Sequence, residues 1–193
     1  MATEFNLIHI STGDLLREEV DKKSVIGKKV AQLIQEGKMA PTELILRILR
    51  MKIEEHRNAP GILIDGFPRS MDQALEFEST VGICRKVLAF SCSLQVLEER
   101  LIERGKTSGR ADDNISTIKK RFDTFDEQSK PVIEYYKSTG KCIEISSEQS
   151  IDDVYEQSRL IIQKNQNLTI LFSDKTIVFV LGGPGSGKGS MTM

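Results

Sequence analysis

The amino-acid sequence predicts an α/β fold in which helices flank a five-stranded parallel sheet. Short runs rich in β-branched and other apolar residues alternate with longer amphipathic stretches along the 193 residues. The last of these runs, Thr176–Leu181, is almost wholly apolar, as expected for a strand that is covered on both faces. Strands separated by helices favour right-handed crossovers, and therefore parallel pairing.

The individual elements follow from local patterns. The predicted strands are residues 6–10, 62–65, 87–91, 142–146 and 176–181. The predicted helices span about 24–36, 42–57 and 151–163, with a long polar helical region over about 94–136 that Gly105 and Gly109 interrupt. Ser11 and Thr12 are candidate caps for a further helix that starts near Gly13. The polar residues 165–167 predict a break after the last helix.

Composition narrows the classes of function. The formal net charge is −1, so the chain has no general attraction to nucleic acid or to an anionic membrane, and an anion site must come from a local cluster of Arg and Lys. The three cysteines fit neither a zinc pattern nor a disulfide framework. There is no secretory leader and no apolar run of membrane-spanning length. We expect a cytoplasmic monomer with no nucleic-acid or membrane partner.

A glycine-rich loop follows the last predicted strand. Residues 182–190 read Gly-Gly-Pro-Gly-Ser-Gly-Lys-Gly-Ser, the spacing of a phosphate-binding P-loop. Glycines let successive backbone N–H groups converge on phosphate oxygens, and Lys188 supplies a mobile positive charge. A glycine-rich turn is the alternative, but the spacing directly after an apolar strand favours the P-loop. Three residues follow Ser190, too few for a stable helix of their own.

Four motifs together resemble the adenylate kinase and UMP-CMP kinase family over nearly the whole chain. They are the P-loop, Ser-Thr-Gly-Asp-Leu-Leu-Arg at 11–17, Asp-Gly-Phe-Pro-Arg at 65–69 and Gly-Arg-Ala-Asp-Asp at 109–113. The resemblance implies a P-loop NTPase-type fold. In the family the P-loop comes first, whereas here it comes last. The order therefore indicates a circular permutation in which the central P-loop strand is made last and residues 164–175 connect the family's former termini. A piece spanning two tandem kinase repeats would have the same order.

The resemblance implies a single kinase domain over residues 1–193, with a monophosphate-binding segment at 11–40 and a short lid at 103–113. Its implied reaction is the reversible, Mg²⁺-dependent transfer of the ATP γ-phosphate to AMP, which gives two ADP. No zinc-binding insert lies in the lid. Closure of the two segments would exclude water from the transfer.

The resemblance also assigns roles to individual residues. The catalytic residues it implies are Lys188, Arg69, Arg104, Arg110 and Arg121. The implied ATP site is Gly183, Gly185, Ser186, Gly187, Lys188, Gly189, Ser190 and Arg100, the last lying against adenine. The implied AMP site is Thr12, Arg17, Ala40, Gly66, Arg69, Gln73, Arg110 and Arg121. Ser190 would bind Mg²⁺, and Asp65 would hold the ion through water.

The identity of the monophosphate that accepts the phosphoryl group is inferred from one position. In adenylate kinases a Gln four residues after the motif's arginine bonds adenine, and this chain has Gln73 four residues after Arg69. UMP-CMP kinases tend to have Asn directly after that arginine and at the fourth place, where this chain has Ser70 and Gln73. Gln73 thus favours AMP, and a UMP or CMP kinase is the first alternative. A permuted or truncated nucleotide-binding domain with little or no activity is the second.

Overall fold

The computed structural model describes residues 1–36, 38–107, 115–169 and 176–192. Its elements, in chain order, are β1 (Ile8–Ser11), α1 (Thr12–Asp21), α2 (Val25–Gln35), α3 (Thr42–Glu55), β2 (Gly61–Asp65), α4 (Met71–Thr80), β3 (Cys84–Ser91), α5 (Leu94–Thr107), α6 (Ile115–Thr124), the π-helix η1 (Phe125–Ser129), α7 (Lys130–Ser138), β4 (Cys142–Ser146), α8 (Ile151–Thr169), β5 (Thr176–Gly182) and α9 (Lys188–Thr192). Within these residues no helix is both long enough and apolar enough to cross a membrane.

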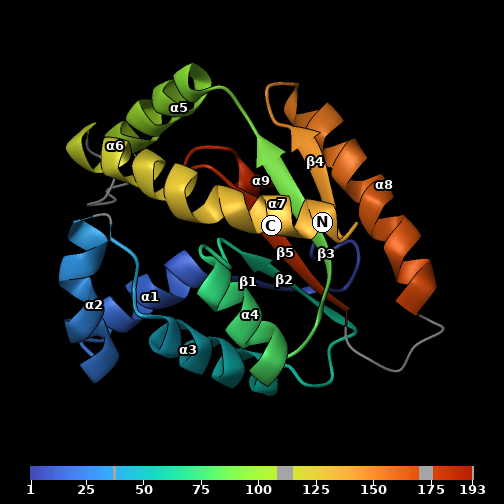
Figure 1. Ribbon diagram of the computed structural model, residues 1–193, viewed down its shortest axis with the longest axis horizontal. Helices are drawn as coiled ribbons and strands as arrows, with labels where there is room; N and C mark the ends of the chain where they lie inside the picture. The colour runs from blue at the N-terminus through green and yellow to red at the C-terminus, as the bar shows by residue number, and fades with distance from the viewer. Residues whose placement is uncertain (37, 108–114, 170–175, 193) are drawn as a thin grey trace.

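The five strands form one parallel sheet in the order β1-β2-β5-β3-β4, which confirms the predicted five-stranded parallel sheet. The strand made last is therefore the central one, because β5 pairs with β2 on one side and with β3 on the other. All strands end at the same edge of the sheet, where the loop after β5 lies (Figure 1).

Strand β5 supplies alternate residues to two hydrophobic cores. Phe179 and its neighbours two residues away pack with α3, α4 and α7 on one face of the sheet. Val178 and Val180 pack on the other face with α8, α9 and the first residues of the chain. This alternation explains why the strand is almost wholly apolar, since neither of its faces meets water.

Three local expectations differ from the structure. Helix α4 was not among the predicted elements; the Ser70 hydroxyl caps it by accepting a hydrogen bond from the Gln73 N–H, at 3.4 Å. Helix α8 continues through the polar residues 165–167 to Thr169, so the predicted break is wrong; Asn and Gln without Gly or Pro do not end a helix. The long helical region comprises α5, which continues through the predicted interruption at Gly105, and then α6 and α7, which the π-helical turn η1 joins; it extends to Ser138.

Helix α9 is short and is held by tertiary contacts. The N–H of Ala2 donates to the carbonyl of Thr192 at 3.1 Å. The Thr192 hydroxyl lies 3.0 Å from Nε2 of His9 on β1. Met191 is buried in the same hydrophobic cluster as Met1 and Ala2. Five residues are too few for a stable isolated helix, so these contacts stabilise it. The two chain ends lie together in Figure 1, in agreement with the hydrogen bond.

Candidate active site

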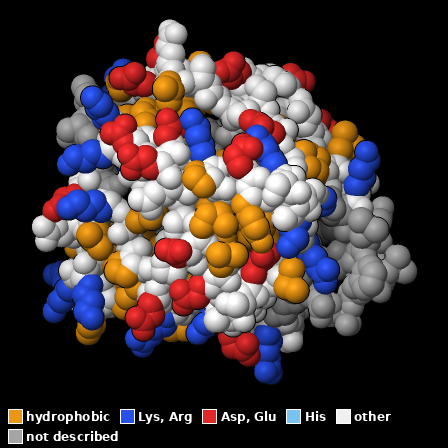
Figure 2. Space-filling model, viewed as in Figure 1, with side chains coloured by type: hydrophobic (Ala, Val, Ile, Leu, Met, Phe, Trp, Pro, Cys, Tyr) orange, Lys and Arg blue, Asp and Glu red, His pale blue; other side chains and the backbone are white. Residues whose placement is uncertain are grey.

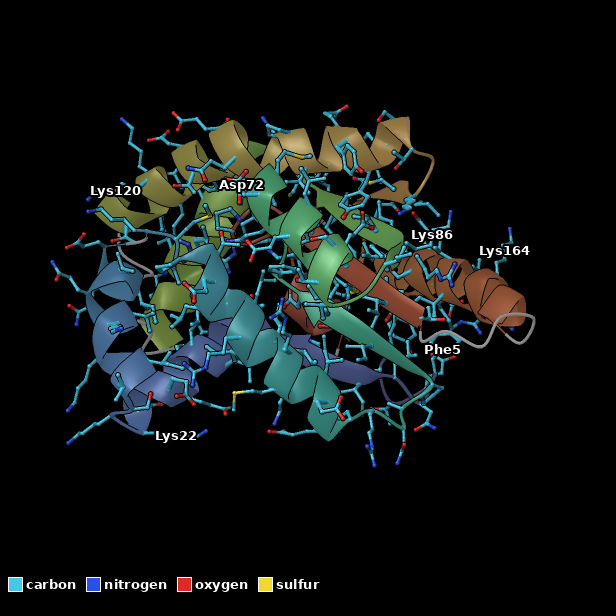
Figure 3. The ribbon with its side chains drawn as sticks, turned by 60° about the horizontal axis from the view of Figure 1, so that its bottom comes forward. Phe5, Lys22, Asp72, Lys86, Lys120 and Lys164 are labelled. Atoms are coloured by element: carbon cyan, nitrogen blue, oxygen red, sulfur yellow. The ribbon has the colours of Figure 1, made fainter. Side chains whose placement is uncertain are left out.

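A cleft of about 540 Å³ opens at the carboxyl edge of the sheet. Ligand sites in open parallel sheets occur at this edge, beside neighbouring strands whose connections diverge. The cleft extends from α1 and α2, across the ends of β2 and β5, to the loop between β4 and α8. In Figures 1 and 3, α2 and the α5–α6 pair stand at the same end of the molecule.

The cleft concentrates positive charge. The basic residues that line it are Arg17, Lys38, Arg69, Arg100, Arg104, Arg121 and Lys188. Among the described lining residues, Asp65 is the one carboxylate. Elsewhere the charges are mixed, and Figure 2 shows acidic and basic side chains interspersed over the visible face. The cleft is therefore a local anion site in a protein whose net charge is near zero.

The loop after β5 has backbone angles that favour glycine. Gly185 has a φ of +84°, and a Cβ there would lie 2.8 Å from the carbonyl oxygen of Leu97. Gly187 has a φ of +82°, and a Cβ there would meet no protein atom within 4 Å. The first glycine is required by protein packing, whereas the second borders open space in the cleft. This is the space that a P-loop leaves for phosphate oxygens.

Lys188 is the first residue of α9, and its side chain contacts the start of this loop. Its Nζ donates to the carbonyl oxygens of Gly182 and Gly183, each at 3.0 Å, and lies 3.5 Å from Oγ of Ser186. Burial lowers the pKa of Lys188 to about 8; Asp65 opposes this shift, and the nearby arginines reinforce it. A bound phosphate would favour the charged ammonium and raise this pKa again. Lys188 is thus a cation whose charged form is destabilised by burial and would be stabilised by a bound anion.

Asp65 provides the oxygen donor that a magnesium ion would use. It is the last residue of β2, and its Oδ1 is buried without a hydrogen-bond partner. Its Oδ2 faces the start of α9, 3.7 Å from where a Cβ of Gly189 would lie. Ser190 lines the same cleft. A carboxylate and a hydroxyl are hard ligands that suit Mg²⁺ with retained waters, so these residues fit the ion.

Two arginines are fixed by main-chain carbonyls. The Nε of Arg69 donates to the carbonyl of Gly66 at 2.8 Å. The guanidinium of Arg100 donates to the carbonyl of Ser147 at 2.9 Å, at the end of the cleft formed by β4 and α8. Arg17 forms an ion pair with Asp14 on the same helix. Planar guanidinium groups held in this way are arranged to recognise phosphate oxygens or to stack on a flat base.

Most of the site residues expected from sequence line the cleft. These are Arg17, Asp65, Gly66, Arg69, Arg100, Arg104, Arg121, Gly185, Ser186, Gly187, Lys188, Gly189 and Ser190. Four others are buried beside it without lining it: Thr12, Ala40, Gln73 and Gly183. Thr12 donates to the carbonyls of Asp65 and Gly66, at 3.2 and 3.1 Å. Arg110 and residues 108–113 of the expected lid lie outside the described residues.

The cleft also contains residues that sequence reasoning missed. They include Ser147, Gln149 and Ile151; Ser11 and Leu16, which also line the cleft, fall within the predicted monophosphate-binding segment 11–40. The first three follow the carboxyl end of β4, and the rule that ligands bind at the carboxyl ends of parallel strands could have identified them.

Comparisons with known proteins identify the family of this chain. The family model "Adenylate kinase" matches residues 1–141. A uridylate kinase of Saccharomyces cerevisiae is 44% identical over 159 residues, which cover 81% of this chain and 78% of that protein. A UMP-CMP kinase of Lentinula edodes is 44% identical over 176 residues, 85% and 78% of the two chains. Human adenylate kinase isoenzyme 1 is 39% identical over 155 residues, 80% of each chain.

The matched range and the cleft point to the same chemistry. Residues 1–141 include the Asp65–Arg69 motif and the arginines of α5 and α6 that line the cleft, and the loop after β5 adds Lys188 to them. A cationic cleft on a five-stranded parallel sheet and a family match over more than half of the chain lead to one conclusion. The chain belongs to the adenylate kinase family and is a nucleoside monophosphate kinase.

Proposed function

We propose that this kinase transfers the γ-phosphoryl group of ATP to UMP in preference to other monophosphates. The observation that supports phosphoryl transfer is the cleft itself, in which Lys188 at the start of α9 lies among arginines of α1, α5, α6 and the loop after β2. Phosphoryl transfer requires mainly positioning and electrostatic stabilisation of charge on the transferring group. The cleft offers both.

The proposed role of each residue follows from its position in the cleft. Lys188 and the P-loop backbone would hold the outer phosphates of ATP, and Arg100 would lie against its base. Arg104 and Arg121 would bind the transferring group, while Arg17 and Arg69 would grip the monophosphate. Asp65 and Ser190 would hold Mg²⁺, which neutralises phosphate charge when it is bound with the nucleotide. No side chain needs to act as a general base.

The preference for UMP is supported by the relatives, and the case for AMP from Gln73 is weaker than its position in the sequence indicates. The uridylate kinases of Saccharomyces cerevisiae and Schizosaccharomyces pombe are 44% and 43% identical to this chain, compared with 39% for human adenylate kinase isoenzyme 1. In addition, the Oε1 of Gln73 accepts a hydrogen bond from the Arg69 N–H at 2.9 Å. One lone pair of that oxygen is therefore occupied, which weakens the use of Gln73 as a paired donor and acceptor for adenine.

AMP is the second candidate, because Gln73 has an unused donor that a base edge could fill. The Nε2 of Gln73 is buried and has no hydrogen-bond partner. An unpaired buried amide costs about 1–3 kcal/mol, so a base edge that accepts from it would be favoured. The N1 atom of adenine is such an acceptor. The carbonyl oxygens of uracil are acceptors too, so this contact alone does not separate the two bases.

Kinetics with different nucleoside monophosphates as the phosphoryl acceptor measure the preference for UMP. With saturating Mg²⁺–ATP, we expect kcat/KM for UMP to exceed that for AMP by about tenfold, the factor that one hydrogen bond of about 1.4 kcal/mol gives. CMP should lie between them. A coupled assay of ADP formation with each monophosphate gives all three values. An AMP rate equal to or above the UMP rate would contradict the proposed preference and restore the prediction from Gln73.

We further propose that the chain is a circular permutation of the family's usual order. Two observations support this proposal. The family match ends at residue 141, before β5 and the P-loop, although β5 is the central strand. Helix α9 meets the first residues of the chain through the Ala2–Thr192 hydrogen bond and a shared core, as the halves of one interrupted helix would.

Rearranging the chain tests this proposal. A variant in which residues 176–193 precede residues 1–169 should fold to the same site and keep its nucleotide KM values. It should also refold faster, because the pairing of β5 with β2 and the contact of α9 with the residues around Ala2 would span fewer positions, which lowers the contact order. Stopped-flow refolding of both chains makes the comparison. A rearranged chain that does not fold, or that refolds no faster, would argue against the permutation.

A further inference from the structure

Two buried side chains hold the main chain of Arg69 from opposite sides. Its N–H donates to Oε1 of Gln73 at 2.9 Å, and its carbonyl accepts from Oγ of Ser129 at 3.0 Å. Gln73 is fully buried, and Ser129 is only 7% exposed. Neither residue lines the main cleft, whereas the Arg69 side chain does. The direction of a cleft arginine is therefore set by contacts made behind it.

Ser129 reaches Arg69 because of an irregular helix. Residues 125–129 form the π-helical turn η1, which joins α6, the helix of Arg121, to α7. In a continuous α-helix, with about 100° per residue, the eight steps from Arg121 to Ser129 would place them about 80° apart around the axis. A π turn contains one residue more than an α turn, so the residues after it are rotated back by about 100° around the helix axis. Arg121 and Ser129 then lie within about 20° of each other.

The small cavity beneath the cleft agrees with this geometry. Arg121 and Ser129 both line it, together with Phe125 from the π turn. Its opposite wall includes Arg69 and Lys188, and its volume is about 80 Å³. The π turn thus places the helix of Arg121 and the hydroxyl of Ser129 on the same side, directly behind the phosphate-binding residues.

We propose that Ser129 is a positioning residue for phosphoryl transfer, acting through the main chain of Arg69 and fixing that arginine relative to Arg121. The proposal rests on the proposed function of the cleft. Without the Ser129 hydroxyl, the carbonyl of Arg69 loses its buried donor and the loop after β2 can tilt. A displacement of about 1 Å at a reacting centre can cost about a hundredfold in rate, so a buried contact can matter for catalysis without touching substrate.

The test compares Ser129→Ala with Ser129→Thr and Ser138→Ala. The Thr variant keeps the hydroxyl. Ser138 lies at the end of α7, and its hydroxyl donates to a carbonyl of the same helix, so this variant removes a similar bond away from the site. For Ser129→Ala we expect a fall of about tenfold or more in kcat/KM for UMP, with the Kd for ATP within about twofold of the wild-type value. Ser129→Thr and Ser138→Ala should stay within about threefold of the wild-type rate.

A double-mutant cycle separates positioning from a general loss of structure. If Ser129 acts through Arg69, Ser129→Ala should have no further effect on UMP affinity in an Arg69→Ala background, as measured by calorimetry. Additive losses in that cycle, equal weakening of ATP and UMP binding, or wild-type kinetics in Ser129→Ala would each overturn the inference. Failure of the proposed function would be distinguishable, because the wild-type chain would then transfer no phosphoryl group to any monophosphate.

Discussion

Replacing Lys188 by Met is expected to lower kcat for phosphoryl transfer by about a hundredfold to a thousandfold, the range for losing one preorganised donor to transition-state charge. Lys188 is the cation of the loop after β5, and its Nζ is held by two carbonyl oxygens at 3.0 Å. Met has a similar length and apolar volume but cannot bind phosphate oxygens. Steady-state kinetics with Mg²⁺–ATP and UMP measures the loss.

The fold should survive this change. The lowered pKa of Lys188 means that the folded protein destabilises its charged form relative to the unfolded chain, so its removal relieves that cost while two hydrogen bonds are lost. Lys52→Met is the matched control, because Lys52 lies on α3 and pairs with Glu55 away from the cleft. It should leave the rate within about twofold, since exposed ion pairs contribute little. A Lys188→Met enzyme that keeps more than a tenth of the wild-type kcat would refute the site assignment.

The second large effect concerns stability. Phe179 lies on the central strand, with its ring centroid 5.2 Å from that of Phe77, 5.7 Å from that of Phe67 and 6.0 Å from that of Tyr136. Its side chain is fully buried. Phe179→Ala should lower the free energy of unfolding by about 3–5 kcal/mol, because the removed ring leaves a cavity that its rigid neighbours cannot fill. Urea denaturation followed by circular dichroism measures the change.

Phe5 provides the comparison for this prediction. It is a partly buried residue that packs at the border of the second core, and Figure 3 shows it at the end of the sheet away from α2 and α6. Phe5→Ala should cost less than half as much as Phe179→Ala, because less apolar area is removed from water and the site can relax. Equal losses for the two variants would contradict a central role for β5 in the sheet.

Sequence patterns found the sheet because each strand carries a compact apolar or β-branched run. The predicted strand at 142–146 matches β4, and the run at 176–181 falls one residue short of β5. The P-loop was equally visible, because glycines at fixed spacing after such a strand have a specific physical role. Helix α4 was missed because its short polar sequence has weak periodicity, and its Ser70 cap is a single residue.

Other features depend on contacts that no local pattern contains. The role of Ser129 requires a π-helical turn and a carbonyl sixty positions away in the chain. The hydrogen bond between Gln73 and the main chain of Arg69 likewise could not be predicted from their spacing in the sequence, because the same side chain could equally have pointed toward a ligand. Helix α9 is held by residues from the opposite end of the sequence, so its local helix propensity underestimates its stability.

The most direct test of the account is whether the loop after β5 performs phosphoryl transfer rather than nucleotide binding alone. ³¹P NMR of the purified chain with Mg²⁺, ATP and UMP measures both substrates and products in one sample. The account predicts that ATP and UMP are consumed together and that ADP and UDP appear in equal amounts, at a rate about a hundredfold to a thousandfold lower for Lys188→Met. Tight ATP binding without transfer to UMP, AMP or CMP would contradict it.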